Sequence, residues 1–187
     1  MNGIHQKKWK IFVARLSKYL HNYGGWPEVF ASPFFNLAFV IALANYQLWQ
    51  SDWVKLSQSL IPSMLGFSLG TYAILFSIIS VKLKRALKEV KNERGIPYLH
   101  EMNATFFHFI FVQVLCVAVS FIHMGTGLHS LLTAIVGPSE DLDSLFWLSR
   151  MILGFLGSTL VFYSLFLAIA AAMIVYRLAT IVEPEPK

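Results

Sequence analysis

Long apolar stretches separated by short polar segments are the most regular feature of the chain. A helix needs about 20 apolar residues to cross a hydrocarbon core of about 30 Å, and four stretches meet that length. In lipid, helices satisfy their own backbone hydrogen bonds, whereas an open sheet leaves polar groups unpaired at its edges. The pattern predicts an all-α membrane protein with a four-helix transmembrane bundle over residues 28–182 and a short tail at 183–187. The predicted spans are residues 29–49, 61–81, 104–124 and 145–176.

The segment before the first span, residues 1–27, has the pattern of an amphipathic helix. At about 100° per residue, its apolar positions fall within an arc of roughly 120°. We expect this helix to lie in the cytoplasmic interface of the membrane, with its cations facing anionic headgroups. Gly24, Gly25 and Pro27 are expected to end the helix and turn the chain into the first span. The cations on its polar face are Lys7, Lys8, Lys10, Arg15 and Lys18.

Basic residues are distributed unevenly between the segments that separate the spans. Thirteen of the 15 Lys and Arg residues lie before the first span, in the link 82–103 or after the fourth span. The other connecting segments hold only Lys55 and Arg150, together with several acidic residues. Cytoplasmic loops of membrane proteins are enriched in Lys and Arg. The distribution therefore predicts an integral membrane protein of the bacterial inner membrane type, with both termini in the cytoplasm.

The link after the second span reads as a continuation of the same helix. Residues 82–94 contain strong helix formers and neither Gly nor Pro. We therefore expect the second span to extend as a helix into the cytoplasm, where its basic face offers a docking surface for a separate cytoplasmic protein. The alternative is a solvated charged helix without a partner. The candidate docking residues are Lys84, Arg85, Lys88 and Lys91.

Small residues recur along one face of the second span, at spacings of three and four. They include a G-x-x-x-G pair, which lets two helix backbones approach closely in a membrane. The fourth span repeats the pattern less regularly, so mutual packing of the two faces is expected. The alternative is a pore lined by these residues, which requires a homo-oligomer. The candidate residues are Ser63, Gly66, Gly70, Ala73, Ser77 and Ser80 in the second span and Gly154, Gly157, Ser164 and Ala168 in the fourth.

Few residues are candidates for a cofactor or metal site. His108 and His123 raise the alternative of a haem-binding electron carrier, but their separation of 15 residues is about 22 Å of helix rise. Since no other span holds a histidine, a haem would need His108 from two chains. We predict no cofactor and no metal; Asn36 and Gln113 are expected to bond across helices. The weaker metal alternative combines His123 and His129 with Glu140, Asp141 and Asp143.

Composition narrows the function classes. The chain is 56% hydrophobic and only 13% charged, far from a soluble domain, so its net charge of +5 indicates the lipid bilayer rather than nucleic acid as partner. Its one cysteine, Cys116, cannot form an internal disulfide. Enzyme motifs such as the Walker A loop and H-E-x-x-H do not occur, so no enzyme is predicted. No acidic or basic residue lies near the centre of a span, which argues against ion-coupled transport.

Two functional hypotheses remain, besides the haem carrier. The first is a homo-oligomeric pore, or a membrane sensor or effector that changes permeability. The second is a membrane anchor or adaptor that recruits a cytoplasmic partner to the link 82–103. In size and number of spans the chain is similar to small bacterial inner-membrane proteins, including membrane components of anti-phage systems, and no motif extends this resemblance.

Overall fold

The computed structural model describes residues 2–179, so the predicted tail at 183–187 lies outside it. The all-α prediction is confirmed for the described residues, whose β-type pairing is limited to an isolated bridge between Lys91 and Pro97. The helices are α1 (Asn2–Tyr23), α2 (Gly25–Ala31), α3 (Pro33–Ala44), the 3-10 helix η1 (Tyr46–Trp49), α4 (Asp52–Ile78), α5 (Val81–Glu89), α6 (Tyr98–Met124), α7 (Gly127–Val136) and α8 (Glu140–Ala179).

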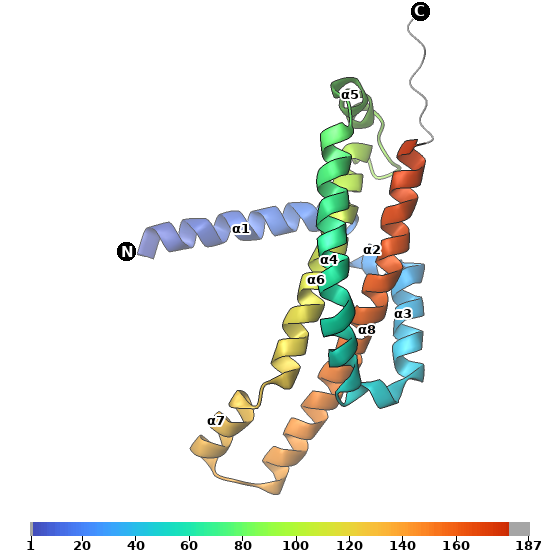
Figure 1. Ribbon diagram of the computed structural model, residues 1–187. Helices are drawn as coiled ribbons and strands as arrows, with labels where there is room; N and C mark the ends of the chain where they lie inside the picture. Colours follow the sequence, from blue (N-terminus) through green and yellow to red (C-terminus); the bar gives the residue numbers. More distant parts are fainter. Residues whose placement is uncertain (1, 180–187) are drawn as a thin grey trace, which may run out of the picture.

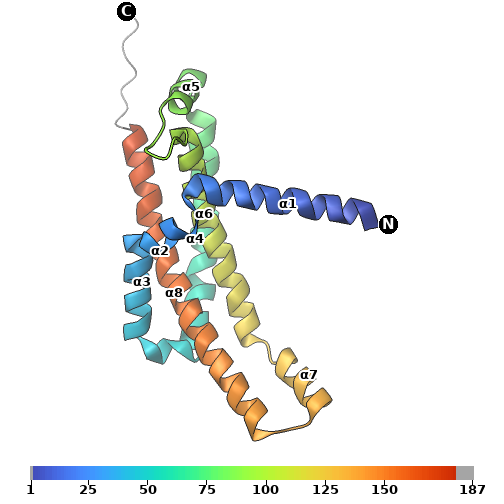
Figure 2. The same ribbon diagram turned by 180° about the vertical axis from the view of Figure 1, so that it is seen from behind.

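Three long helices, α4, α6 and α8, form the body of the protein. Each is long and apolar enough to cross a membrane, and Figures 1 and 2 show them running side by side. α3 packs on α8, and its Ala38 and Ala42 are completely buried. Large side chains such as Trp53, Phe106 and Tyr163 fill the interior. These are the spanning helices expected of an integral membrane protein.

The predicted first span, residues 29–49, is not one helix. α2 and α3 meet at a bend of 57°, and η1 follows after Asn45. Ser32 is extended because Pro33, the first residue of α3, disfavours a helical conformation in the residue before it. The 12 residues of α3 rise only about 18 Å, which is less than the hydrocarbon core. A fourth span therefore stays a prediction that requires α2 and α3 to count together.

The predicted helical extension of the second span is also interrupted. Ile79 and Ser80 have extended backbone angles, and the Ser80 hydroxyl accepts a hydrogen bond from the backbone N–H of Leu83 at 3.2 Å. Serine is a favourable N-cap, so it starts a new helix, α5, instead of continuing α4. Leu87 of α5 is buried, and α5 packs against α6. The prediction of one continuous helix from residue 61 to residue 94 is wrong, because the helix is interrupted at Ile79 and Ser80 and α5 ends at Glu89.

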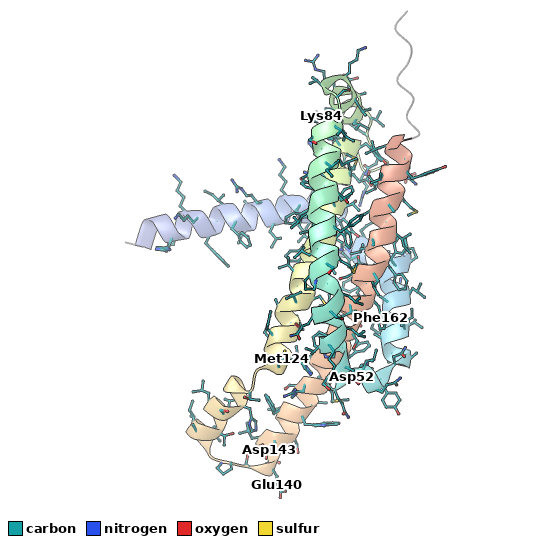
Figure 3. All side chains as sticks on the ribbon, in the orientation of Figure 1. Asp52, Lys84, Met124, Glu140, Asp143 and Phe162 are labelled. Carbon is teal, nitrogen blue, oxygen red and sulfur yellow. The ribbon has the colours of Figure 1, made fainter. Side chains whose placement is uncertain are left out.

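The opposite end of the bundle is formed by α7 and the start of α8. The hydroxyl of Ser139 accepts a hydrogen bond from the backbone N–H of Leu142 at 3.2 Å, so Ser139 caps the N-terminus of α8. Figure 3 shows Glu140 and Asp143 at this end and Lys84 at the other. Sequence analysis did not foresee α7, a ten-residue helix in the connection between the last two spans.

The N-terminal helix α1 projects sideways from the bundle (Figures 1 and 2). It contacts α6 near its C-terminal end, where Tyr19 is buried, and its N-terminal part extends away from the other helices. The predicted turn follows it: Gly24 and Gly25 have φ angles of 120° and 78°, which glycine adopts without strain. A methyl group at Gly24 would also overlap the Arg94 guanidinium.

Two glycines of α8 allow other parts of the chain to approach closely. A methyl group at Gly154 would overlap the backbone carbonyl of Trp49, at the end of η1. A methyl group at Gly157 would overlap the indole ring of Trp53, at the start of α4. The glycines therefore position η1 and the first turn of α4 against α8.

We expect Gly154→Ala to lower the free energy of unfolding by about 1–3 kcal/mol, because the obstructing atoms belong to backbone and cannot rotate away. Thermal unfolding in detergent measures the change. Gly127→Ala on α7 is the control: no atom lies within 4 Å of the added methyl group, so stability should stay constant or rise by up to about 1 kcal/mol. Equal stability of the two variants would contradict this account.

Candidate functional site

The small residues of the second span face outward. We define the outward face of α4 as Ser63, Gly66, Gly70, Ala73 and Ser77, which are all exposed; Ser80, the last residue of the predicted pattern, is also exposed but caps α5. At about 100° per residue, this face is opposite the buried stripe of Ile61, Ser68 and Leu75. Nothing lies within 4 Å of a methyl group placed at Gly66 or Gly70. A single chain thus leaves this face unpacked.

The small residues of the fourth span lie inside the chain instead. Gly154, Gly157 and Ser164 are buried and Ala168 is half-buried. Gly154 and Gly157 pack against the Trp49 and Trp53 region described above, and the Ser164 hydroxyl bonds to its own helix at the Leu160 carbonyl. The structure does not bring the two small faces together, so the expected mutual packing is wrong.

Polar side chains occupy the buried side of α6. The side-chain amide of Gln113 donates to the Ser68 hydroxyl at 3.1 Å, which confirms the predicted bond between helices. The Ser57 hydroxyl lies 3.4 Å from the Cys116 sulfur. Asn36 behaves differently from its prediction, because its amide donates locally to carbonyls at the α2–α3 bend. The buried polar residues of α6 are His108, Gln113, Ser120 and His123.

His108 joins three helices at what we call the histidine junction, formed by Tyr19, Tyr23, His108 and Tyr163. The Tyr19 hydroxyl contacts His108 Nδ1, and the Tyr163 hydroxyl lies 2.9 Å from its Nε2. The Tyr23 ring stacks on the imidazole with 4.1 Å between ring centroids. A neutral imidazole donates from one nitrogen and accepts at the other, so both hydroxyls are satisfied. The junction attaches α1 to α6 and α8.

The hydrogen bonds of His108 and His123 bear on the alternative of a haem-binding site. Both ring nitrogens of His108 are engaged by tyrosines, and His123 bonds through Nε2 to the Gln50 carbonyl at 2.7 Å. His123 Nδ1 is buried without a hydrogen-bond partner, whereas His108 has no ring nitrogen left for a haem iron. Sequence analysis missed the junction, although Tyr19 and Tyr23 stand one helical turn apart on the apolar side of α1.

Burial affects the titration of the α1 tyrosines. It raises the pKa of Tyr19 and of Tyr23 above the ordinary phenol value, since the charged phenolate is poorly solvated there. Both groups are therefore neutral at physiological pH, and their hydroxyls remain able to donate hydrogen bonds to neighbouring groups. The attachment of α1 is thus independent of pH below the ordinary phenol pKa as far as these two groups are concerned.

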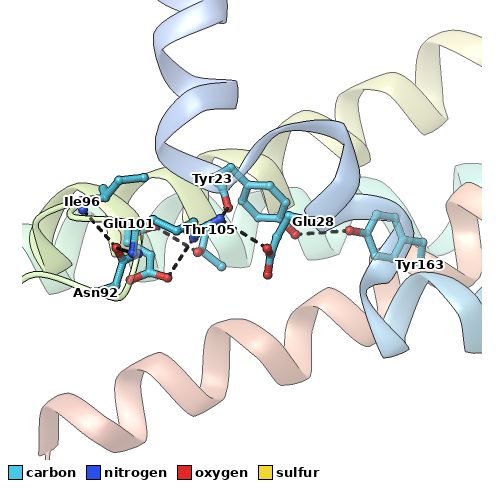
Figure 4. A network of polar contacts seen from close by, with 8 residues as sticks. Tyr23, Glu28, Asn92, Ile96, Glu101, Thr105 and Tyr163 are labelled. Carbon is cyan, nitrogen blue, oxygen red and sulfur yellow. Dashed lines mark hydrogen bonds and ion pairs between the residues drawn. The ribbon is translucent and has the colours of Figure 1, made fainter.

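Arg94 forms a second attachment beside the histidine junction (Figure 4). Its guanidinium donates to the Tyr23 carbonyl at 3.2 Å and pairs with Glu28 and Glu101 at 3.3 Å each. The Asn92 side chain holds the loop by accepting from two backbone N–H groups, at 3.0 Å each. One arginine thus links the end of α1, α2 and α6.

The predicted basic residues lie mainly on the surface. On α1, Lys7, Lys8, Lys10, Arg15 and Lys18 are all exposed. On and after α5, Arg85, Lys88 and Lys91 are exposed and Lys84 is half-buried. At the other end, His129 pairs with Asp143 at 2.8 Å, far from His123 on its Gln50 partner. Within residues 2–179, no three His, Cys, Asp or Glu side chains gather as a metal site.

Comparison with known proteins returned no match to any family model, curated protein or solved structure. The functional assignment therefore rests on the geometry of this chain alone.

We expect His108→Phe to loosen α1, because it leaves the Tyr19 hydroxyl without its partner and removes one of the two partners of the Tyr163 hydroxyl. Each unpaired buried hydroxyl costs about 1–3 kcal/mol. Electron paramagnetic resonance distances between spin labels at Ser17 and Ser144, with Cys116 replaced by Ser, should broaden from one population to several. His21→Phe is the control, since His21 is exposed on the same helix. An unchanged narrow distribution in His108→Phe would show that other contacts hold α1.

Proposed function

We propose that the protein is a homo-oligomeric integral membrane protein that alters membrane permeability, either as a pore or as a sensor and effector. The observation that carries the proposal is the outward face of α4. Small side chains there lie opposite the core, and no atom of another described helix lies within 4 Å of a methyl group placed at Gly66 or Gly70. In membranes, such faces permit close backbone contact between two helices. A second helix packs against the small side chains more closely than lipid tails do.

Exposed apolar side chains at the α5 end of the bundle add a second argument. Tyr72 lines the same groove as the α1 residues, so it marks the level of α1 on α4. Ile78 lies about 9 Å further along the helix and is 71% exposed. On α8, Tyr176 lies about 20 Å past Tyr163 and is 70% exposed. If α1 lies in the headgroup layer, which is about 5–8 Å thick on each side, these side chains extend past it. A second copy would cover them.

The interior of one chain has no room for a conducting path of its own. Trp53, Ile61, Phe106 and Tyr163 are buried to 2% exposure or less between the long helices. Any pore of this protein would therefore lie between copies, where the outward faces of α4 contribute Ser63 and Ser77 hydroxyls. This arrangement agrees with the requirement that a four-helix chain must oligomerise to enclose a channel.

We assign the α5 end to the cytoplasm, with α1 on the cytoplasmic membrane surface. The support is the distribution of basic residues, since α1, α5 and the following loop hold most of them, whereas Glu140 and Asp143 lie at the opposite end. The proposed location is a bacterial inner membrane. In this orientation α1 is suited to sense the membrane surface, because the histidine junction fixes it to the spanning helices.

Self-association should fail when the outward face of α4 is filled. In native mass spectra from lipid nanodiscs we expect the wild type as a closed oligomer of about three or more chains, and Gly70→Leu mainly as monomer. Efflux of a small dye from vesicles should fall at least tenfold. Gly127→Leu is the control, since Gly127 also has open surroundings but lies on α7.

The two measurements separate the parts of the proposal. A Gly70→Leu variant that assembles like the wild type would refute the contact through α4. A variant that loses assembly but releases dye at the wild-type rate would refute a pore formed by the oligomer, while the proposed self-contact through α4 would stand.

A membrane adaptor is a second candidate, favoured by the orientation of α5. Leu87 is buried toward α6, so the helix holds a fixed position while Arg85, Lys88 and Lys91 face outward. These cations suit an acidic surface on a cytoplasmic protein. The interruption at Ser80 places them beside the start of α6 instead of far from the membrane.

Charge reversal tests the adaptor. With a photo-crosslinking amino acid at exposed Glu89, we expect a discrete cytoplasmic adduct in cells expressing the wild type. Arg85→Glu with Lys88→Glu should reduce its yield at least tenfold. The same crosslinker at exposed Thr126, next to α7, is the control and should give no such adduct. An adduct of equal yield after reversal would remove the adaptor from consideration.

A further inference from the structure

A groove of about 390 Å³ lies in the corner between α1 and the bundle. We call it the α1 groove. α1 forms one wall, and Tyr72 of α4 with His100 and Phe107 of α6 form the other. The groove exists because the histidine junction holds α1 sideways against α6 (Figure 1). It is therefore a feature of the tertiary structure and not of α1 alone.

One side of the groove is basic. Arg15 and Lys18 stand three residues apart on α1, one helical turn, and both are exposed. No Asp or Glu lines the groove, and neither cation forms an ion pair with a residue of the range 2–179. The nearby Glu101 of α6 is paired with Arg94. Two uncompensated cations on one wall favour an anion.

Neutral polar groups add hydrogen-bond donors to the same groove. Asn103 accepts from the Tyr72 hydroxyl at 2.5 Å, which leaves the amide N–H groups of Asn103 as donors. Asn22 and His100 also line the groove and are half-buried. Several donors around a pair of cations match the oxygen-rich surface of a phosphate group.

The remaining lining residues are apolar. Phe12 and Leu16 of α1 face Ala104 and Phe107 of α6 across the groove. A free phosphate ion gains nothing from such a surface, whereas the acyl chains of a lipid do. The combination of cations, amide donors and apolar walls therefore fits one class of ligand.

We propose that the α1 groove binds one anionic phospholipid per chain, with the headgroup phosphate between Arg15 and Lys18 and the acyl chains along Phe12 and Phe107. The inference rests on the proposed placement of α1 at the membrane surface. It goes beyond general attraction of cations to the bilayer, because it assigns a defined site that also uses residues of α4 and α6.

The other cations of α1 supply a matched control. Lys7 and Lys10 border a hollow that is formed by α1 residues alone, without a wall from the bundle. Replacing them changes the charge of α1 as much as replacing Arg15 and Lys18 does. A surface that attracts lipid only through charge would respond equally to both replacements.

Native mass spectrometry of the full chain from nanodiscs tests the site, with equal amounts of phosphatidylglycerol and phosphatidylcholine. We expect the wild type to retain one phosphatidylglycerol per chain. Occupancy should fall at least tenfold in Arg15→Gln/Lys18→Gln and stay within twofold in Lys7→Gln/Lys10→Gln. Equal losses in both variants, no loss in the first, or equal retention of phosphatidylcholine would overturn the proposal.

A second arm distinguishes the lipid from free phosphate. In detergent, millimolar inorganic phosphate should not displace the retained phosphatidylglycerol, because it lacks acyl chains. Displacement by phosphate would assign the groove to the free ion and overturn the lipid proposal. The variant Arg15→Lys/Lys18→Arg keeps both positive charges and should retain the lipid. Loss of the lipid from this variant would show that positive charge at these two positions is not what binds it.

The same spectra separate this inference from the proposed oligomer. Gly70→Leu should become monomeric and still retain phosphatidylglycerol, which supports the site independently of self-association. Arg15→Gln/Lys18→Gln that keeps the wild-type subunit number and loses its lipid supports the site in the same way. Loss of the lipid in monomeric Gly70→Leu would refute a site contained within one chain.

Discussion

His108 is held between the hydroxyls of Tyr19 and Tyr163 in the interior of the molecule, and the position of α1 depends on this contact. A buried imidazole without partners is costly, so the arrangement that satisfies both of its nitrogens is strongly favoured over those that do not. That arrangement brings the end of α1 against α6 and points the rest of α1 sideways. Arg94 then closes the turn beside it through Glu28 and Glu101.

Two kinds of contact join the helices of the bundle: hydrogen bonds between polar side chains, and close packing at glycine residues. Gln113 and Ser68 bond in the middle of the α4–α6 contact, while Gly154 and Gly157 bring η1 and α4 close to α8. Lipid provides no hydrophobic force between helices, so such contacts determine which faces meet. Because Ser68 and its neighbours fill the inner side of α4, its small residues are left on the outer side.

The sequence predicted those features that depend on local length and pattern, and missed those that depend on distant partners. The spans in α4, α6 and α8 follow from their apolar length. The breaks at Ser32 and Ser80 also have local causes, a following proline and a capping serine. The contact of Tyr19 with His108 joins residues 89 positions apart, and no local pattern specifies it. Periodicity alone could not distinguish the buried Gly154 from the exposed Gly70, because packing within one chain and packing between chains require the same spacing of small residues.

The proposed lipid site and the proposed self-contact share α4, which gives a physical basis for regulation. A lipid in the α1 groove would contact Tyr72, which directly precedes Ala73 and is five residues from Ser77 on the outward face of α4. Binding shifts an assembly equilibrium only when the lipid has different affinities for the separate and assembled chains. In the proposed mechanism, a tilt of α1 with the membrane surface would change the shape of the groove, because α1 forms one wall and Tyr72 of α4 is part of the other. The proposed sensing at α1 and the proposed assembly through α4 would then be coupled through the residues that line the α1 groove.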